Sequence, residues 1–378
     1  MNKTLRLSIF SLSTLALVSA IWGGLYRIGW HVNPLAGELP GIHGPLVVCG
    51  FLGAVFALDR ALVLKKLWGD VVPVFILVGS FLLFVRPVSQ LCPAIIFVGS
   101  LGFTAMCFEV NLRQPNLYNR MIFLGSLLWL AGIGMWFLRW PVYNVYLWWL
   151  GFVLFTMVGQ RLELARRVRL TQPPPQLLAT AICIVFLGQI ALAVGHLRGS
   201  DALMDIVLDS IFDPRTTWGM RIAGTGIATT AAWLLVYDAA WSLLKSKGNA
   251  RFSAVCLISS YGWLAVSGVI SVLHAGIVSG PPYDALIHSF FIGFVWFIIF
   301  GHGPILAFSS MKMRAPPMAS LYLPVAVLHV SLVMRVAGDM SRNAGLVKNG
   351  GLLNAIGLLL FILLLSFRVV RERATVSA

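Results

Sequence analysis

Long apolar runs alternate with short polar segments along the whole chain. Most of these runs are close to the roughly 20 residues that a helix needs to cross the hydrocarbon core of a bilayer. The pattern predicts an all-α, polytopic membrane bundle that forms a single domain over residues 1–378. Twelve spans are expected, at about residues 8–26, 43–60, 71–86, 91–110, 119–138, 143–160, 176–195, 219–240, 253–274, 284–309, 319–337 and 349–369.

Basic residues gather at alternate ends of the predicted spans. Of the 28 lysines and arginines, 19 lie at the ends that share a side with the N-terminus. Because short cytoplasmic loops carry an excess of Lys and Arg, the bias predicts that both termini are cytoplasmic. The nine basic residues at the opposite ends are Arg27, Arg86, Arg139, Arg198, Arg215, Arg221, Arg335, Arg342 and Lys348.

Composition agrees with this topology. The chain is 59% hydrophobic and only 11% charged, with a mean hydropathy of +0.88, whereas soluble domains carry about 25% charged residues. A net charge of +15 often indicates nucleic-acid binding, but here the charge is spread over loops as a topology signal. The lipid bilayer is the expected partner and nucleic acid is not. The sequence carries no signal for the oligomeric state.

Two histidines lie on one predicted span, near its two ends. His288 and His302 are separated by fourteen residues, which corresponds to roughly 21 Å along an α-helix and a difference of about 40° in direction. An ideal helix would therefore present both on one face. That distance rules out a shared metal ion and favours two sites at different depths. Gly301 and Pro304 predict that the helix kinks or opens beside His302.

An inner pair is expected from depth. His302 lies roughly 11 Å from the inner end of its span, and His329 lies roughly 15 Å into the next span. Consecutive antiparallel helices are usually neighbours, so these imidazoles can face one another. Two such rings suit a bis-histidine haem or part of a copper site. The alternative is that each ring is hydrogen-bonded to a neighbouring helix.

An outer pair is expected from His288 and His43, with His274 as the rival partner. Asp284 precedes His288 by four residues and so shares its helix face, where a carboxylate can hold the ring N–H. Outer-end arginines, Arg335 among them, are candidates to pair with haem propionates. Their other interpretation is that they extend to the membrane interface.

Several common chemistries are not predicted. The chain has no phosphate-binding loop, nucleophile elbow or HExxH motif. It has no HxH or HH pair, so the three-histidine copper site of terminal oxidases cannot be assembled in the usual way. None of its five cysteines forms a CxxC pair. Whether the protein catalyses a reaction stays open at this stage.

The histidine-bearing segments resemble the NnrS family. The resemblance rests on the run Asp284-Ala285…His288…Gly293…Gly301-His302-Gly303, on His43 at the start of the second span, and on Leu328-His329…Met334-Arg335-Val336. Members of that family are twelve-span bacterial inner-membrane proteins associated with haem, copper and the response to nitric oxide. The resemblance implies His43, His288, His302 and His329 as cofactor residues. After His302, however, this chain continues with Gly303-Pro304-Ile305 where the family usually has Thr-Gly-Arg.

The first functional hypothesis is therefore a haem-binding, multi-pass protein of the bacterial inner membrane, with haem b as the expected cofactor and copper as a further candidate. It would act in tolerance of nitric oxide or metal stress, or in electron transfer that involves a redox partner. The alternative is a transporter of metal ions or small solutes. In that case the membrane histidines His43, His274, His288, His302 and His329 would serve as transient ligands.

Overall fold

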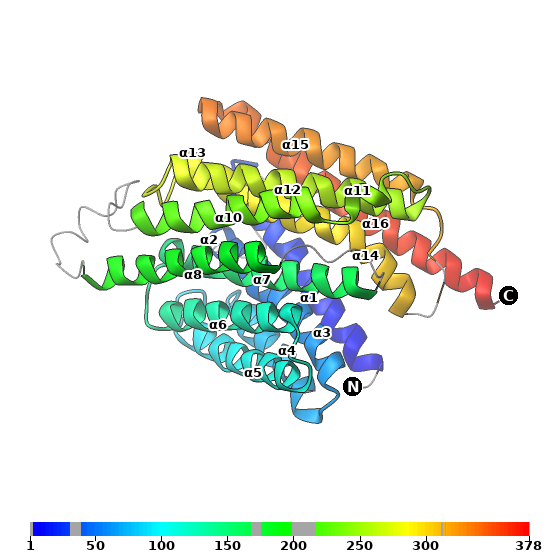
Figure 1. Ribbon diagram of the computed structural model, residues 1–378, viewed down its shortest axis with the longest axis horizontal. Coiled ribbons are helices and arrows are strands. Elements are labelled where there is room, and N and C mark those ends of the chain that lie inside the picture. The colour runs from blue at the N-terminus through cyan, green and yellow to red at the C-terminus, as the bar shows by residue number, and fades with distance from the viewer. Residues whose placement is uncertain are drawn as a thin grey trace. The chain divides into compact units, whose positions relative to one another are not determined.

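The computed structural model describes residues 3–30, 39–167, 175–198, 217–310, 313 and 315–377 (Figure 1). Across these ranges the chain is helical and contains no β-strand. Its contacts divide it into two compact units, Met1–Val168 and Arg169–Ala378. Each unit is described below by itself.

The first unit is a set of helices joined by short turns. Its elements are α1 (Lys3–Arg27), α2 (Leu39–Pro45), the π-helix η1 (Leu46–Gly53), α3 (Ala54–Leu64), α4 (Leu67–Leu82), α5 (Leu91–Arg113), α6 (Leu117–Phe137) and α7 (Val142–Arg167). Helices α4 to α7 pack each against the next, and α1 lies along α2 and η1. Buried aromatic rings fill the interior: Trp129 stacks on Phe152 with 4.7 Å between ring centroids, and Phe103 meets Trp129 edge-on.

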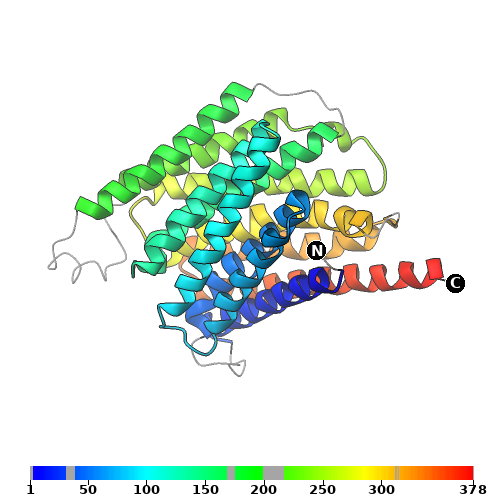
Figure 2. The same ribbon diagram turned by 90° about the horizontal axis from the view of Figure 1, so that it is seen from below.

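The second unit carries most of the candidate histidines. Its elements are α8 (Pro175–Arg198), α10 (Thr217–Tyr237), α11 (Ala240–Leu243), α12 (Asn249–Leu273), α13 (Pro281–His288), the π-helix η3 (Ser289–Trp296), α14 (Phe297–Ser310), the 3₁₀ turn η4 (Ala319–Leu321), α15 (Tyr322–Ser341) and α16 (Ala344–Ser377). Helix α10 packs between α8 and α12, and α15 packs along α16. The last turns of α16, drawn in red, extend past the other helices of this unit (Figures 1 and 2).

Ten helices in the described ranges are long and apolar enough to cross a membrane. They are Thr4–Arg27, Leu39–Leu64, Leu91–Arg113, Leu117–Phe137, Val142–Leu164, Gln176–Val194, Asn249–Leu273, Pro281–Leu306, Ala319–Ser341 and Ala344–Glu372. The predicted spans at 71–86 and 219–240 fall on α4 and α10, which are not among these ten. Helix α4 has only 16 residues, or roughly 24 Å. The all-helical class is confirmed, and the ten apolar helices are consistent with a membrane protein. The count of twelve spans and the side of the termini stay predictions.

Two of the ten helices contain a π-helical segment of eight residues, η1 and η3. Each segment includes a glycine against which a tryptophan packs. A Cβ atom on Gly53 would lie 2.6 Å from Cζ2 of Trp129, and one on Gly293 would lie 2.4 Å from Cβ of Trp263. Such π segments inside α-helices occur often at functional sites. Both of these begin within three residues of a candidate histidine, His43 or His288.

The structure corrects two expectations about the span that carries His288 and His302: the kink beside His302 and the shared helix face. Residues Gly301 to Pro304 stay α-helical within α14, and the departure from α geometry lies earlier, at Ser289–Trp296. Because a π turn holds more residues than an α turn, the difference of about 40° expected between His288 and His302 does not apply across η3. The expectation assumed an unbroken α-helix, and the sequence carries no sign of the wider turn.

The close approach at Gly293 gives a testable prediction. Replacing Gly293 by Ala places a methyl group against Trp263 and within 3.0 Å of Leu332, so we expect the free energy of unfolding to fall by about 1–3 kcal/mol. The measurement is thermal unfolding of the purified protein in detergent. Gly262→Ala is the matched control, because nothing lies within 4 Å of a Cβ atom there. Equal unfolding temperatures for both variants would contradict this packing.

Candidate functional site

His288 is held at the last turn of α13 by its own helix. Helix α13 begins at Pro281, a residue suited to the first helical positions. His288 Nδ1 lies 2.8 Å from the main-chain oxygen of Asp284 and 3.4 Å from Oδ2 of the same residue. Both oxygens only accept hydrogen bonds, so Nδ1 carries the proton. In the neutral ring, the lone pair is then on Nε2.

Arg335 on α15 binds the carboxylate of Asp284. Its Nε and Nη2 donate to Oδ2 of Asp284 at 3.1 and 2.6 Å. The Arg335 side chain is only 7% exposed, whereas that of Asp284 is 28% exposed. Asp284 and His288 are neighbours at i,i+4 as expected, but the nearer acceptor for the His288 ring is the main-chain oxygen of Asp284 and not its carboxylate.

Asp339 is a fourth member of this group. It lies four residues after Arg335 on α15 and is 4% exposed, and its carboxyl is close enough to that of Asp284 for the two to interact electrostatically. Arg335 also acts on it electrostatically. Asp284, His288, Arg335 and Asp339 are called the charged cluster below. It joins α13 to α15 through the ion pair between Arg335 and Asp284, and the carboxyl of Asp339 lies close to this pair.

Helix α16 supports the α15 side of the charged cluster. A Cβ atom on Gly350 would lie 2.8 Å from the backbone nitrogen of Arg335, and one on Gly338 would lie 2.8 Å from Cβ of Leu346. These glycines therefore let the two backbones approach closely, as small residues do between membrane helices. Ser331 donates a hydrogen bond of 2.6 Å to Oδ1 of Asn354 across the same interface. The position of Arg335 is thus fixed by packing as well as by charge.

His43 in the first unit is held in a similar way. It lies in α2, half-buried, and its Nδ1 donates to the main-chain oxygen of Pro40 at 2.9 Å. A carbonyl only accepts, so the neutral ring has its lone pair on Nε2, as in His288. Histidines that bind metals usually have their other ring nitrogen fixed by such a donated hydrogen bond.

Nδ1 of His329 accepts a hydrogen bond, whereas Nδ1 of His43 and of His288 donates one. The indole Nε1–H of Trp263 donates to Nδ1 of His329 at 3.3 Å, and the ring lies 4.3 Å from that of Phe297 between centroids. Because the indole only donates, the neutral imidazole has its proton on Nε2. Ligation through Nε2 would require the proton to move and this hydrogen bond to break. The contacts are those of a histidine hydrogen-bonded to a neighbouring helix.

The other two candidates lie elsewhere in the second unit. His302 is buried in α14, next to Gly301, where an added Cβ atom would lie 3.1 Å from Cβ of Cys256 on α12. His274 closes α12 and is half-buried, with its backbone N–H bonded to Ile270. In the described ranges, no group of three or more His, Cys, Asp and Glu side chains is placed to hold a metal ion.

Sequence reasoning missed Asp339 and Trp263. The i,i+4 spacing of Arg335 and Asp339 is a readable signal, since oppositely charged residues four apart share a helix face. Trp263 has no such signal, because its contact with His329 depends on how α12 packs against α15. The structure brings Asp284, His288 and Arg335 together. The pairings of His43 with His288 and of His302 with His329 stay predictions.

Breaking the charged cluster should destabilise the protein. Arg335→Gln removes the cation that pairs with Asp284 and leaves that carboxylate beside the carboxyl of Asp339, so we expect the free energy of unfolding to fall by about 3–5 kcal/mol. Arg342→Gln is the control, because Arg342 is exposed at the end of α15, and its effect should stay within about 0.5 kcal/mol. Thermal unfolding in detergent measures both. An Arg335→Gln protein as stable as the wild type would show that the cluster does not hold α13 to α15.

Comparison with known proteins agrees with this description of a chain organised over its full length. No curated protein matches it. One family model, described as "Domain of unknown function (DUF8744)", matches residues 6–370 and so includes both units and every candidate histidine. The chain therefore belongs to the DUF8744 family.

Proposed function

We propose that this protein is an integral membrane haem protein in which His43 and His288 would each hold haem through a ring nitrogen. The supporting observation is the hydrogen bond that each ring donates through Nδ1, to Pro40 and to Asp284 respectively. In both rings the neutral tautomer then has its lone pair on Nε2, which is the nitrogen that would bind iron. The resemblance to the NnrS family supports haem as the group that is bound.

Haem suits isolated histidines better than a bare metal ion does. The porphyrin provides four nitrogen ligands, so the protein needs to add only one or two. A copper ion bound by protein alone would need several side chains to converge. Copper therefore ranks second to haem b in this proposal. When bound, the haem would supply one-electron or nitric oxide chemistry, and the chain would supply the axial nitrogen and the apolar surroundings.

Asp284 and Arg335 would act as positioning residues. Asp284 fixes the ring of His288 through its main-chain oxygen, and Arg335 fixes Asp284 from the neighbouring helix. Hydrogen-bond partners behind a metal ligand set its tautomer and orientation. Because Arg335 is already bound to Asp284, holding the ligand is a better role for it than binding a haem propionate.

The proposed setting is the bacterial inner membrane, with twelve spans and both termini in the cytoplasm. The bias of basic residues toward alternate ends supports this orientation. His43 and His288 would then lie near the periplasmic surface, where a redox partner could exchange electrons with the haem. Tolerance of nitric oxide or metal stress, or electron transfer, is the corresponding cellular role.

Transport is the second candidate, and the charged cluster favours it. Ionisable groups inside membrane-spanning helices often mark an ion or solute pathway. Arg335 and Asp339 lie within the span Ala319–Ser341 and are both buried. A transporter would use these groups and the histidines as transient ligands, and it would carry no resident haem.

Absorption spectroscopy of the full chain tests the proposal. The protein, expressed in cells supplied with haem and purified in detergent, should show a Soret band. His43→Ala and His288→Ala should each lower the haem content by about tenfold or more, because an axial ligand is lost. His329→Gln is the matched control and should keep the spectrum, since Nδ1 of His329 accepts a hydrogen bond from Trp263.

Two outcomes would contradict the proposal. One is a wild-type protein with neither a Soret band nor bound metal by mass analysis, which would leave transport as the better candidate. The other is a loss of haem in His329→Gln as large as in His288→Ala, which would mean that the tautomers do not identify the ligands. Gel filtration of each variant checks that it is folded.

A further inference from the structure

A second site of different chemistry lies in the first unit, at the end that is predicted to be cytoplasmic. It is a cavity of about 450 Å³ lined by Arg6, Ala61, Leu62, Lys65, Lys66, Leu67 and Asp70. The residues come from α1, from the end of α3, from the turn that follows it and from the start of α4. We propose that this cavity binds the phosphate headgroup of an anionic phospholipid.

The cavity collects positive charge from three separate places in the chain. Arg6 comes from the first turns of α1, Lys65 follows α3, and Lys66 directly precedes α4. Lys65 has φ of +56°, so the chain reverses direction there and presents the two lysines in succession. Positive loop residues that act only as a topology signal have no need to converge on one cavity.

Neighbouring carboxylates offset this charge only in part. Asp70 lines the cavity and is buried. Glu109 binds Lys66 at 2.6 Å and Arg113 at 2.5 Å through the same oxygen, Oε1. The cavity lining thus has three cations and one carboxylate, an excess of two positive charges. Glu109 and Arg113 lie beside Lys66 outside the lining, and their opposite charges leave this excess unchanged. That excess matches an anion, and a phosphate diester is the anion that a bilayer supplies in quantity.

The surface beside the cavity suits acyl chains. Leu67 is 85% exposed, and Val71 and Trp68 on the same helix are 48% and 40% exposed. Ala61 and Leu62 give the cavity an aliphatic wall. A headgroup held by the cations can therefore lie beside an apolar surface that accommodates its tails, which a free phosphate ion would not use. Basic pockets between membrane helices on the cytoplasmic side bind anionic headgroups in this way.

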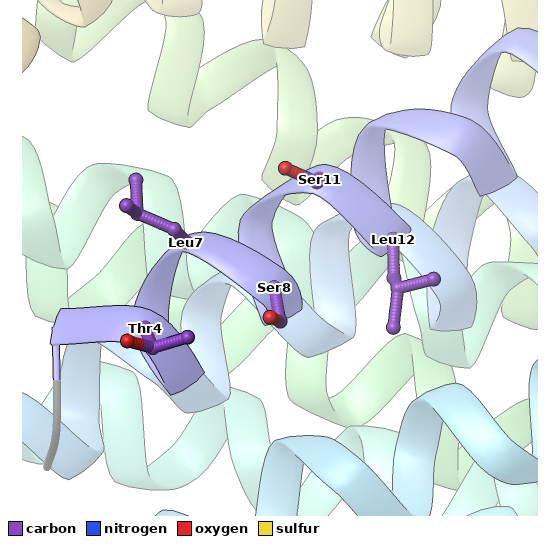
Figure 3. A pocket seen from close by; sticks show the side chains of 5 residues that line it. All are labelled: Thr4, Leu7, Ser8, Ser11 and Leu12. Carbon is purple, nitrogen blue, oxygen red and sulfur yellow. The ribbon is translucent and has the colours of Figure 1, made fainter.

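A larger hollow on the same unit lacks this chemistry. It measures about 500 Å³ and is lined by Thr4, Leu7, Ser8, Ser11 and Leu12, which all belong to α1 (Figure 3). Hydroxyl and aliphatic side chains of one helix carry no charge that would select a lipid headgroup. The basic cavity is therefore the better candidate for a specific lipid.

Native mass spectrometry of the full chain, titrated with phosphatidylglycerol or phosphatidylcholine, tests the proposal. We expect phosphatidylglycerol to bind in preference, more weakly as salt is added. Removing one cation should weaken binding about fivefold, and the triple variant Arg6→Gln, Lys65→Gln, Lys66→Gln should weaken it on the order of a hundredfold. An excess of inorganic phosphate should leave the lipid bound.

The matched control is the triple variant Lys245→Gln, Lys247→Gln, Arg251→Gln. It removes three exposed cations from the turn before α12 and the first turn of α12, which have the same predicted orientation, and it should leave lipid binding unchanged. Arg6→Gln alone serves if the cavity triple variant does not fold. Equal binding of both lipids, equal losses in cavity and control variants, or displacement of the lipid by inorganic phosphate would each overturn the proposal.

Discussion

A polar side chain buried in a membrane-spanning helix must find its partner within the protein, because the lipid offers none. In the second unit this constraint is met by the bond between Arg335 and Asp284. The bond joins α13 to α15, fixes the residue that holds the His288 ring, and brings Asp339 into the same group. This bond therefore links the helix that carries His288 to α15.

The histidines also need hydrogen-bond partners within the protein, and they differ in which partners they have. His43 and His288 donate to main-chain carbonyl groups, whereas His329 accepts from an indole. A ring that donates through one nitrogen is ready to bind a metal through the other, and a ring that accepts through Nδ1 has to rearrange first. Each of the two rings that donate through Nδ1 also lies just before a π-helical segment. In the sequence, the π-helical segment η1 lies between His43 and α3, and η3 lies between His288 and α14.

The pattern of apolar runs was sufficient for the fold class, because the length of a spanning helix is set by the bilayer. The i,i+4 rule was sufficient to associate Asp284 with His288, since that relation is local to one helix. It would also have associated Arg335 with Asp339. The i,i+4 rule does not predict contacts between helices. Which side chain meets Asp284 or His329 depends on packing at Gly350 and Gly293. The π segments were also not predictable, because their residues are as apolar as those of an ordinary span.

The central claim is that His43 and His288 have the proton on Nδ1, so that the lone pair of each neutral ring is on Nε2. Solid-state nitrogen NMR of the protein labelled with ¹⁵N-histidine, without added cofactor, measures this directly, with single histidine-to-glutamine variants to assign the signals. The account predicts neutral rings protonated at Nδ1 for His43 and His288, and a neutral ring protonated at Nε2 for His329. A neutral ring protonated at Nε2 for His288, or an imidazolium at neutral pH, would contradict it.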